Sequence, residues 1–202
     1  MTATATEPAA DRLLTIPNLI TFARLACLPL FLYLLFGRDD RASAAWLLGG
    51  LGATDWVDGY LARRLGQVSE FGKVFDPTVD RLLFIVGVSA ILIDGVPPTW
   101  FFIAVLVREV LVGAVIAIAT VAFGMVRFDV TFLGKLATFL LMFAVPGFLL
   151  AASDFAGAEV VEVASWLLAI PGLVLSWYVA ATYIPKISAG IEAGRATPAS
   201  PG

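Results

Sequence analysis

Six long apolar segments follow one another along the chain, separated by short stretches of charged or helix-breaking residues. A helix needs about 20 apolar residues to cross the hydrocarbon core of a bilayer, and each segment has roughly that length. The predicted spans are Ile16–Phe36, Ser43–Leu65, Phe71–Ile93, Pro97–Phe123, Val130–Ala152 and Val160–Ile184. The pattern therefore predicts an all-α integral membrane protein with six transmembrane helices.

The two ends of the chain differ from this apolar region. Residues 1–12 and 188–202 are rich in Ala, Thr, Pro and Gly, a composition typical of disordered tails. We expect one membrane domain over residues 13–187, with no internal repeat and no second domain. A cleaved signal peptide is not expected, because Arg12 is the only basic residue of the first twelve and no small-residue cleavage site follows a short apolar core.

The distribution of Lys and Arg predicts the orientation of the spans, since these residues concentrate in cytoplasmic loops. With the N-terminus inside, eight basic residues lie on the cytoplasmic side and only Arg38 and Arg41 lie outside. The inner residues are Arg12, Arg63, Arg64, Lys73, Arg127, Lys135, Lys186 and Arg195. Both termini are therefore predicted to be cytoplasmic, in a multi-pass protein of the plasma membrane.

Composition narrows the possible chemistry. Hydrophobic residues make up 60% of the 202 residues and charged residues only 14%, whereas soluble proteins average about 25% charged. A net charge of −3 argues against nucleic-acid binding. The chain has no histidine and a single cysteine, which excludes Ser-His-Asp and Cys-His nucleophile systems and His- or thiolate-based zinc sites. Any metal must have oxygen ligands, which favours Mg²⁺ or Mn²⁺.

Four aspartates interrupt the second and third apolar segments. Carboxylates inside a membrane are costly unless they are paired, hydrated or bound to a cation. Asp55 and Asp58 are three residues apart and Asp76 and Asp80 are four apart, so each pair shares one helix face. The connection between the two segments is short enough for an antiparallel hairpin. The spacing therefore predicts a four-carboxylate cluster near the cytoplasmic boundary, able to hold a cation.

The acidic residues belong to a longer motif, whose fixed positions are Asp55, Asp58, Gly59, Ala62, Arg63, Gly72, Asp76 and Asp80. Written out, it is D-x-x-D-G-x-x-A-R-x8-G-x3-D-x3-D. It resembles, at every specified position, the signature of the CDP-alcohol phosphotransferases. The resemblance covers about residues 15–185 and includes six spans with the motif on the second and third. Members of this family are homodimers that transfer a phosphate-linked group from a CDP-linked donor, usually CDP-diacylglycerol, to an alcohol and release CMP.

The resemblance also assigns roles to the motif residues. It implies that two Mg²⁺ or Mn²⁺ ions are held by Asp55, Asp58, Asp76 and Asp80. It also implies that Asp80 is the general base that takes the proton of the acceptor hydroxyl. It implies that the cytidine and its phosphates are held by Gly59, Ala62, Arg63 and Gly72. Two simpler interpretations stay open: Asp76 before Pro77 could be a helix N-cap, and Arg63 could only anchor the helix at the cytoplasmic surface.

Two further segments resemble family elements. Pro17-Asn18-x-x-Thr21-x-x-Arg24 matches an opening P-N-x-x-T-x-x-R element, and its polar residues share one helix face. We expect Asn18, Thr21 and Arg24 to line the site, although Asn18 and Thr21 could serve helix initiation and interhelical hydrogen bonds alone.

The other candidates lie on the fourth and fifth spans. Arg108, beside Glu109 near mid-span, is predicted to contact an acceptor phosphate or else to form a structural ion pair. Lys135 and Thr138 resemble a G-K-x-x-T element of the glycerol-type branch, and Lys135 could alternatively be a surface anchor.

The acceptor is predicted less sharply than the reaction. The opening element and Asp76-Pro77 are similar to the bacterial glycerol branch, whose acceptors are phosphatidylglycerol, which gives cardiolipin, or glycerol-3-phosphate. Phosphatidylglycerophosphate synthases typically have Lys where this chain has Arg81, and a further Arg where it has Val115. We therefore favour phosphatidylglycerol slightly, with glycerol-3-phosphate as the alternative. A non-enzymatic ion carrier is disfavoured, because the motif acids gather towards one side of the membrane.

Overall fold

The computed structural model describes residues 16–65, 70–123 and 131–196, and every regular element in these ranges is helical. The helices are α1 (Ile16–Leu32), a π-helical turn η2 (Tyr33–Gly37), α2 (Arg41–Leu65), α3 (Glu70–Ile93), α4 (Thr99–Phe123), α5 (Phe132–Ala151) and α6 (Ala158–Ala196). The predicted all-α fold is confirmed. Four described helical segments are long and apolar enough to cross a membrane: Leu19–Gly37, Thr99–Phe123, Phe132–Ala151 and Ala158–Ala189.

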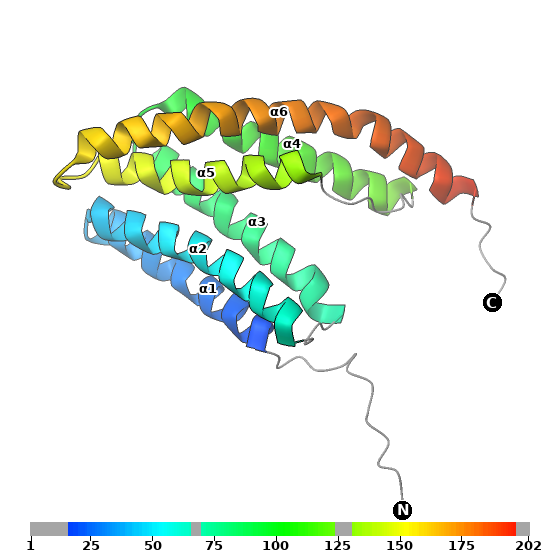
Figure 1. Cartoon of the computed structure of the whole chain (residues 1–202), viewed down its shortest axis with the longest axis horizontal. Coiled ribbons are helices and arrows are strands. Elements are labelled where there is room, and N and C mark those ends of the chain that lie inside the picture. Colours follow the sequence, from blue (N-terminus) through cyan, green and yellow to red (C-terminus); the bar gives the residue numbers. More distant parts are fainter. Residues whose placement is uncertain (1–15, 66–69, 124–130, 197–202) are drawn as a thin grey trace, which may run out of the picture.

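The helices form two groups joined by α3. In Figure 1, α4, α5 and α6 lie together, α1 and α2 lie together below them, and α3 crosses from one group to the other. Contacts of α2 with α5 and of α3 with α4 connect the groups. Short turns follow α1, α3 and α5, and these turns meet at one end of the molecule, where the helices converge.

The hydrophobic core fills this converging end. Phe101 and Phe102 of α4 and Phe148 of α5 are buried and pack ring against ring, with centroids 5.3 to 6.0 Å apart. Phe31 of α1 belongs to the same buried cluster. Close packing of large apolar side chains here fixes the relative positions of the helices, because protein interiors tolerate few voids.

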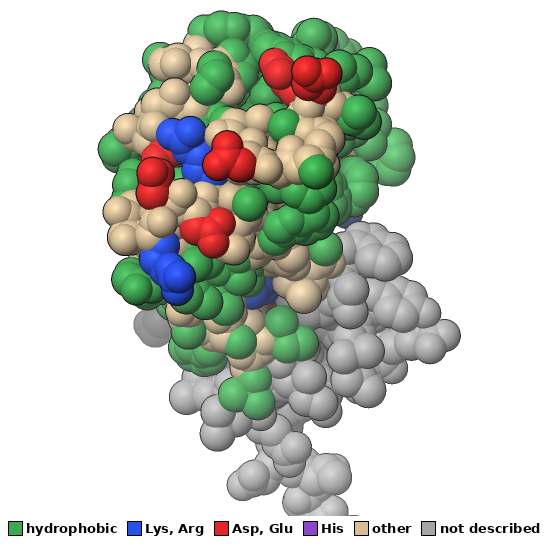
Figure 2. All heavy atoms as spheres, turned by 90° about the vertical axis from the view of Figure 1, so that its left-hand side faces the viewer, with side chains coloured by type: hydrophobic (Ala, Val, Ile, Leu, Met, Phe, Trp, Pro, Cys, Tyr) green, Lys and Arg blue, Asp and Glu red, His purple; other side chains and the backbone are tan. Residues whose placement is uncertain are grey.

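Polar interactions close the same end. Asp40 caps α2 by accepting a hydrogen bond from the Ser43 backbone N–H (2.9 Å). This bond, with the Ser43 hydroxyl and the positive charge of Arg38, lowers the pKa of the Asp40 carboxyl below its ordinary value. Arg41 donates from Nε to Asp94 Oδ2 (2.8 Å) and from Nη1 to the Ala152 carbonyl (3.2 Å). Charged side chains gather on this face, surrounded by hydrophobic ones (Figure 2).

The helix bounds agree with the predicted spans within two residues, except at the end of the last one. Helix α6 continues through Pro185 to Ala196 instead of ending near Ile184. Hydropathy falls after Ile184, but three alanines and the long side chains of Lys186, Glu192 and Arg195 still favour a helix, so the helix outlasts the apolar segment. Nine residues of the predicted tail 188–202 are therefore helical, whereas residues 1–15 and 197–202 lie outside the described part of the chain.

Candidate active site

Two of the four motif aspartates are held by α1. Thr21 Oγ1 donates a 2.7 Å hydrogen bond to Asp76 Oδ1, and Arg24 forms an ion pair with Asp80 through Nη1 and Oδ1. Thr21 and Arg24 are both almost fully buried, with 1% and 4% of their surface exposed. Because α1 and α3 run in the same direction, residues three apart on α1 meet residues four apart on α3. Thr21 and Arg24, which were predicted to line the site, thus contact the two motif aspartates of α3, and their role in the site stays a prediction.

The other half of the motif lies outside the described side chains. Asp55, Asp58, Gly59, Ala62 and Arg63 fall within α2, and Gly72 falls within α3. Asn18 is likewise a residue of α1 whose side chain is not described. Only residues 66–69 separate α2 from α3, which agrees with the short connection expected from the sequence.

The carboxylates of α3 have the chemistry of a hard-cation site, with oxygen donors one helical turn apart. Within the described side chains, no three Asp, Glu or Cys residues come together. The predicted metal cluster has two members, Asp55 and Asp58, outside that set, so the four-carboxylate arrangement stays a prediction. The buried hydroxyl of Thr21 and guanidinium of Arg24 hold Asp76 and Asp80 as outer partners hold metal-binding carboxylates.

A large cavity of about 1140 Å³ adjoins Asp80. Its charged wall consists of Arg24, Asp80, Arg81, Arg108 and Glu109. The rest is mainly apolar and is supplied by α2, α3, α4 and α5, with residues such as Leu48, Leu51, Leu83, Phe84, Val112, Ile116, Leu141, Met142 and Val145. The cavity can therefore hold a molecule that has an anionic group at one end and hydrocarbon at the other.

Arg108 and Glu109 form part of an ionic network that crosses this cavity wall. Glu109 accepts hydrogen bonds of 2.7 Å from Arg81 Nε on one oxygen and from Arg108 Nη1 on the other. Arg108 is buried and also donates from Nε to the Ser176 carbonyl of α6 (3.3 Å). Arg108 thus makes the ion pair that is expected of a cation at mid-span, and it lines the cavity as well.

The sequence named Glu109 only as a possible ion-pair partner of Arg108, and Arg81 only as a departure from the phosphatidylglycerophosphate synthases. The available signal was that Arg81 directly follows Asp80 and Glu109 directly follows Arg108. That these two residues contact each other depends on how α3 and α4 are rotated, which sequence spacing alone does not determine.

The two candidate residues on α5, Lys135 and Thr138, lie in different surroundings. Thr131 caps the helix by accepting a hydrogen bond from the Gly134 N–H, and the Thr138 hydroxyl donates to the Gly134 carbonyl. Gly134 and Thr138 line the cavity, whereas Lys135 is exposed and is not among the lining residues.

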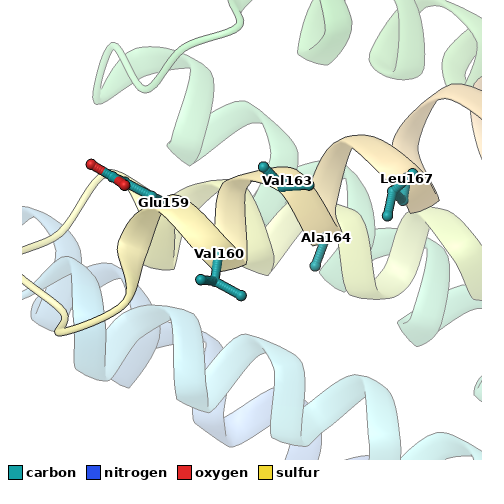
Figure 3. Close-up of a pocket in the computed structure, with 5 residues that line it drawn as sticks. All are labelled: Glu159, Val160, Val163, Ala164 and Leu167. Carbon is teal, nitrogen blue, oxygen red and sulfur yellow. The ribbon is translucent and has the colours of Figure 1, made fainter.

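A second hollow, of about 440 Å³, lies on the surface of α6. Its lining residues are Glu159, Val160, Val163, Ala164 and Leu167, which all come from this one helix (Figure 3). Glu159 is the only one with a polar side chain, so the hollow offers no pair of groups for catalysis.

Comparison with known proteins agrees with the motif and with the helical fold. A family model described as CDP-alcohol phosphatidyltransferase matches residues 14–180. A protein of Streptomyces coelicolor named cardiolipin synthase (CMP-forming) is 37% identical over 189 residues, covering 90% of this chain and 86% of the relative. A Rickettsia typhi protein named CDP-diacylglycerol–glycerol-3-phosphate 3-phosphatidyltransferase is 33% identical over 172 residues, 78% of this chain and 92% of the relative. A Bacillus subtilis protein of that same name is 36% identical over 108 residues, covering 46% of this chain and 56% of the relative. The chain belongs to the CDP-alcohol phosphatidyltransferase family.

Proposed function

We propose that the protein transfers the phosphatidyl group of CDP-diacylglycerol to phosphatidylglycerol, which gives cardiolipin and CMP. The observation that carries this proposal is the cavity beside Asp80, which joins a charged wall to a large apolar interior. Each substrate is a lipid with a phosphate-bearing head group and hydrocarbon chains. These two parts match the charged wall and the apolar interior of the cavity. The name of the Streptomyces relative also supports it.

Glycerol-3-phosphate is the alternative acceptor. The names of the Rickettsia and Bacillus relatives favour it. It is small and water-soluble, however, and makes no use of the apolar part of the cavity. Among the described residues around Glu109, two arginines and one glutamate leave a single net positive charge. One positive charge suits the monoanionic phosphodiester of phosphatidylglycerol better than a phosphate dianion.

In the proposed reaction, Asp80 takes the proton of the acceptor hydroxyl. The hydroxyl oxygen forms a bond to the phosphorus of the phosphatidyl group. The bond from this phosphorus to the oxygen shared with CMP breaks, and CMP leaves with that oxygen. Arg24 orients the Asp80 carboxylate, and Thr21 orients Asp76.

The remaining motif residues complete the proposed site. Asp55, Asp58, Asp76 and Asp80 would hold two Mg²⁺ or Mn²⁺ ions, which shield the negative charge of the pyrophosphate when bound. Gly59, Ala62, Arg63 and Gly72 would hold the cytidine and its phosphates. Asn18, Arg108 and Thr138 would complete the acceptor side, with Lys135 at its edge.

The proposal includes a membrane arrangement. All six helices would cross the plasma membrane, with both termini and the site on the cytoplasmic side, and two chains would form a homodimer. Helices α2 and α3 would be the two polar spans, since they carry the motif aspartates.

The test is a CMP-release assay with purified protein, CDP-diacylglycerol and Mg²⁺. Phosphatidylglycerol, glycerol-3-phosphate and inositol phosphate are offered separately. Release with phosphatidylglycerol alone is expected, and release with glycerol-3-phosphate alone would establish the alternative. EDTA should stop the reaction and added Mg²⁺ or Mn²⁺ should restore it. Activity that EDTA leaves unchanged would contradict the metal requirement.

A further inference from the structure

Three arginines line the large cavity, and they differ in the exposed fraction of their side chains. The side chains of Arg24 and Arg108 are enclosed, with 5% and 9% of their surface exposed, whereas that of Arg81 is 42% exposed. In the described part of the chain, the Arg81 guanidinium donates only to Glu109, through Nε. A guanidinium has five N–H donors, so four of those on Arg81 are available to a ligand.

Helix α4 provides a defined seat for Arg81. Glu109 and Gly113 are four residues apart and share one face of α4. Glu109 Oε1 receives the Arg81 Nε–H at 2.7 Å. A Cβ atom at position 113 would lie 3.2 Å from Arg81 Nη1 and 3.4 Å from Cζ, so the guanidinium occupies the space that the missing side chain leaves.

Glu109 does more than neutralise Arg81. Its second oxygen accepts a hydrogen bond from Arg108, which is fixed in turn by the Ser176 carbonyl. The carboxylate is therefore held from the α6 side and cannot turn away with Arg81. The 2.7 Å bond therefore joins the Arg81 guanidinium to a carboxylate that Arg108 holds in position.

We propose that Glu109 and Gly113 seat Arg81 on the cavity wall, and that the seated Arg81 binds the phosphate of the glycerol-type acceptor. This inference rests on the proposed function and adds the group that recognises the acceptor. Arg81 is the binding residue, and Glu109 and Gly113 are positioning residues.

The same geometry bears on Val115, where a further cation is typical of phosphatidylglycerophosphate synthases. Val115 is exposed and is not among the residues that line the cavity. Arg81 therefore supplies a cation to the described cavity wall independently of position 115.

The test measures KM and kcat for each substrate in full-length protein with substitutions at the seat. Arg81→Gln should raise the KM for the acceptor about tenfold, the loss expected for one charged hydrogen bond. The KM for CDP-diacylglycerol should not change. Arg81→Lys should restore part of the affinity, because it keeps the charge and loses the planar fork.

Two positioning variants have matched controls. Gly113→Ala should raise the acceptor KM severalfold, while Gly50→Ala, at a helical glycine with open space around it, should not. Glu109→Gln should act like Gly113→Ala, while Glu159→Gln on the outer surface of α6 should leave KM unchanged. Adding Gly113→Ala to Arg81→Gln should cause no further loss, because a methyl group at position 113 acts on the acceptor only through Arg81.

The inference is overturned if active Arg81→Gln protein keeps the wild-type acceptor KM, or if the KM values of both substrates rise together. If the Arg81 variants have no activity, labelling of wild-type protein with phenylglyoxal decides the matter. The acceptor should protect Arg81 from labelling. Equal labelling with and without acceptor would contradict binding of the acceptor by Arg81. The acceptor that wild-type protein uses tests the proposed function separately, since the KM comparison applies to phosphatidylglycerol and to glycerol-3-phosphate alike.

Discussion

At the scale of single residues, the site depends on buried donors that orient the two described carboxylates of α3. Asp80 forms an ion pair with Arg24, and Asp76 accepts a hydrogen bond from the Thr21 hydroxyl. Both donors are buried, so water cannot easily replace them if they are removed. The two aspartates of α3 are therefore held in place from the α1 side.

Asp80→Asn should abolish turnover while the protein still binds CDP-diacylglycerol. The amide has nearly the shape of the carboxylate and cannot accept the acceptor proton, and loss of a general base typically costs about 10² to 10⁴ in rate. Single-turnover CMP release and a separate CDP-lipid binding measurement check this. Normal turnover in the variant would show that Asp80 is not the base.

Thr21→Val should weaken the apparent affinity for Mg²⁺ while leaving the fold intact. Valine has the same shape but cannot donate to Asp76, and removing the outer partner of a metal ligand typically costs about 10- to 100-fold in metal affinity. A Mg²⁺ titration of CMP release measures the change. Thr182→Val on α6, whose hydroxyl bonds only to its own helix, is the control; equal Mg²⁺ curves for wild type and Thr21→Val would contradict the role of this bond.

At the scale of helices, the converging end keeps the bundle together. Arg41 at the start of α2 reaches Asp94 beyond the end of α3 and the carbonyl of Ala152 beyond the end of α5. One side chain therefore joins the ends of three helices, at a distance from the cavity residues.

Arg41→Met should lower the free energy of unfolding by about 1–3 kcal/mol, because Asp94 is left with its charge poorly compensated. The KM values for both substrates should stay at wild-type levels. Thermal unfolding in detergent, together with the CMP-release assay, measures the two effects. Arg38→Met, at an exposed residue near the same end, is the control. A large change in KM with Arg41→Met would show that the contacts of Arg41 also influence the site.

The sequence predicted the helices well and their mutual contacts only in part. Apolar length and breakers predicted the bounds of the helices, and spacing by three residues predicted that Thr21 and Arg24 share one helix face, which in the structure meets α3. The end of α6 was missed, because a helix can continue where hydropathy falls. The pairing of Arg81 with Glu109 was missed too, because it depends on how two helices are rotated against each other.

At the scale of the whole molecule, the helices pack closely at one end and surround a cavity beside the acidic residues. Its apolar part is large enough that acceptor hydrocarbon becomes a factor in selectivity. A change in that part should therefore separate a lipid acceptor from a soluble one.

Ala117→Phe should reduce the kcat/KM for phosphatidylglycerol severalfold. Ala117 lines the cavity from α4, and a phenyl ring there occupies space that we assign to acceptor hydrocarbon. The ratio of kcat/KM values for phosphatidylglycerol in variant and wild type measures the effect. Ala164→Phe, in the shallow hollow of α6, is the control, and an unchanged ratio would place the acceptor chains elsewhere.

Asp80 and Arg81 are consecutive residues, yet one pairs with α1 and the other with α4. Successive side chains of a helix point about 100° apart, so α3 serves two different neighbours from a single turn. A one-residue insertion in α3 just before Asp80 would rotate both side chains away from their partners at once. The motif spacing therefore also fixes the rotation of α3 about its axis, and a shift of one residue would break the pairings with α1 and α4 together.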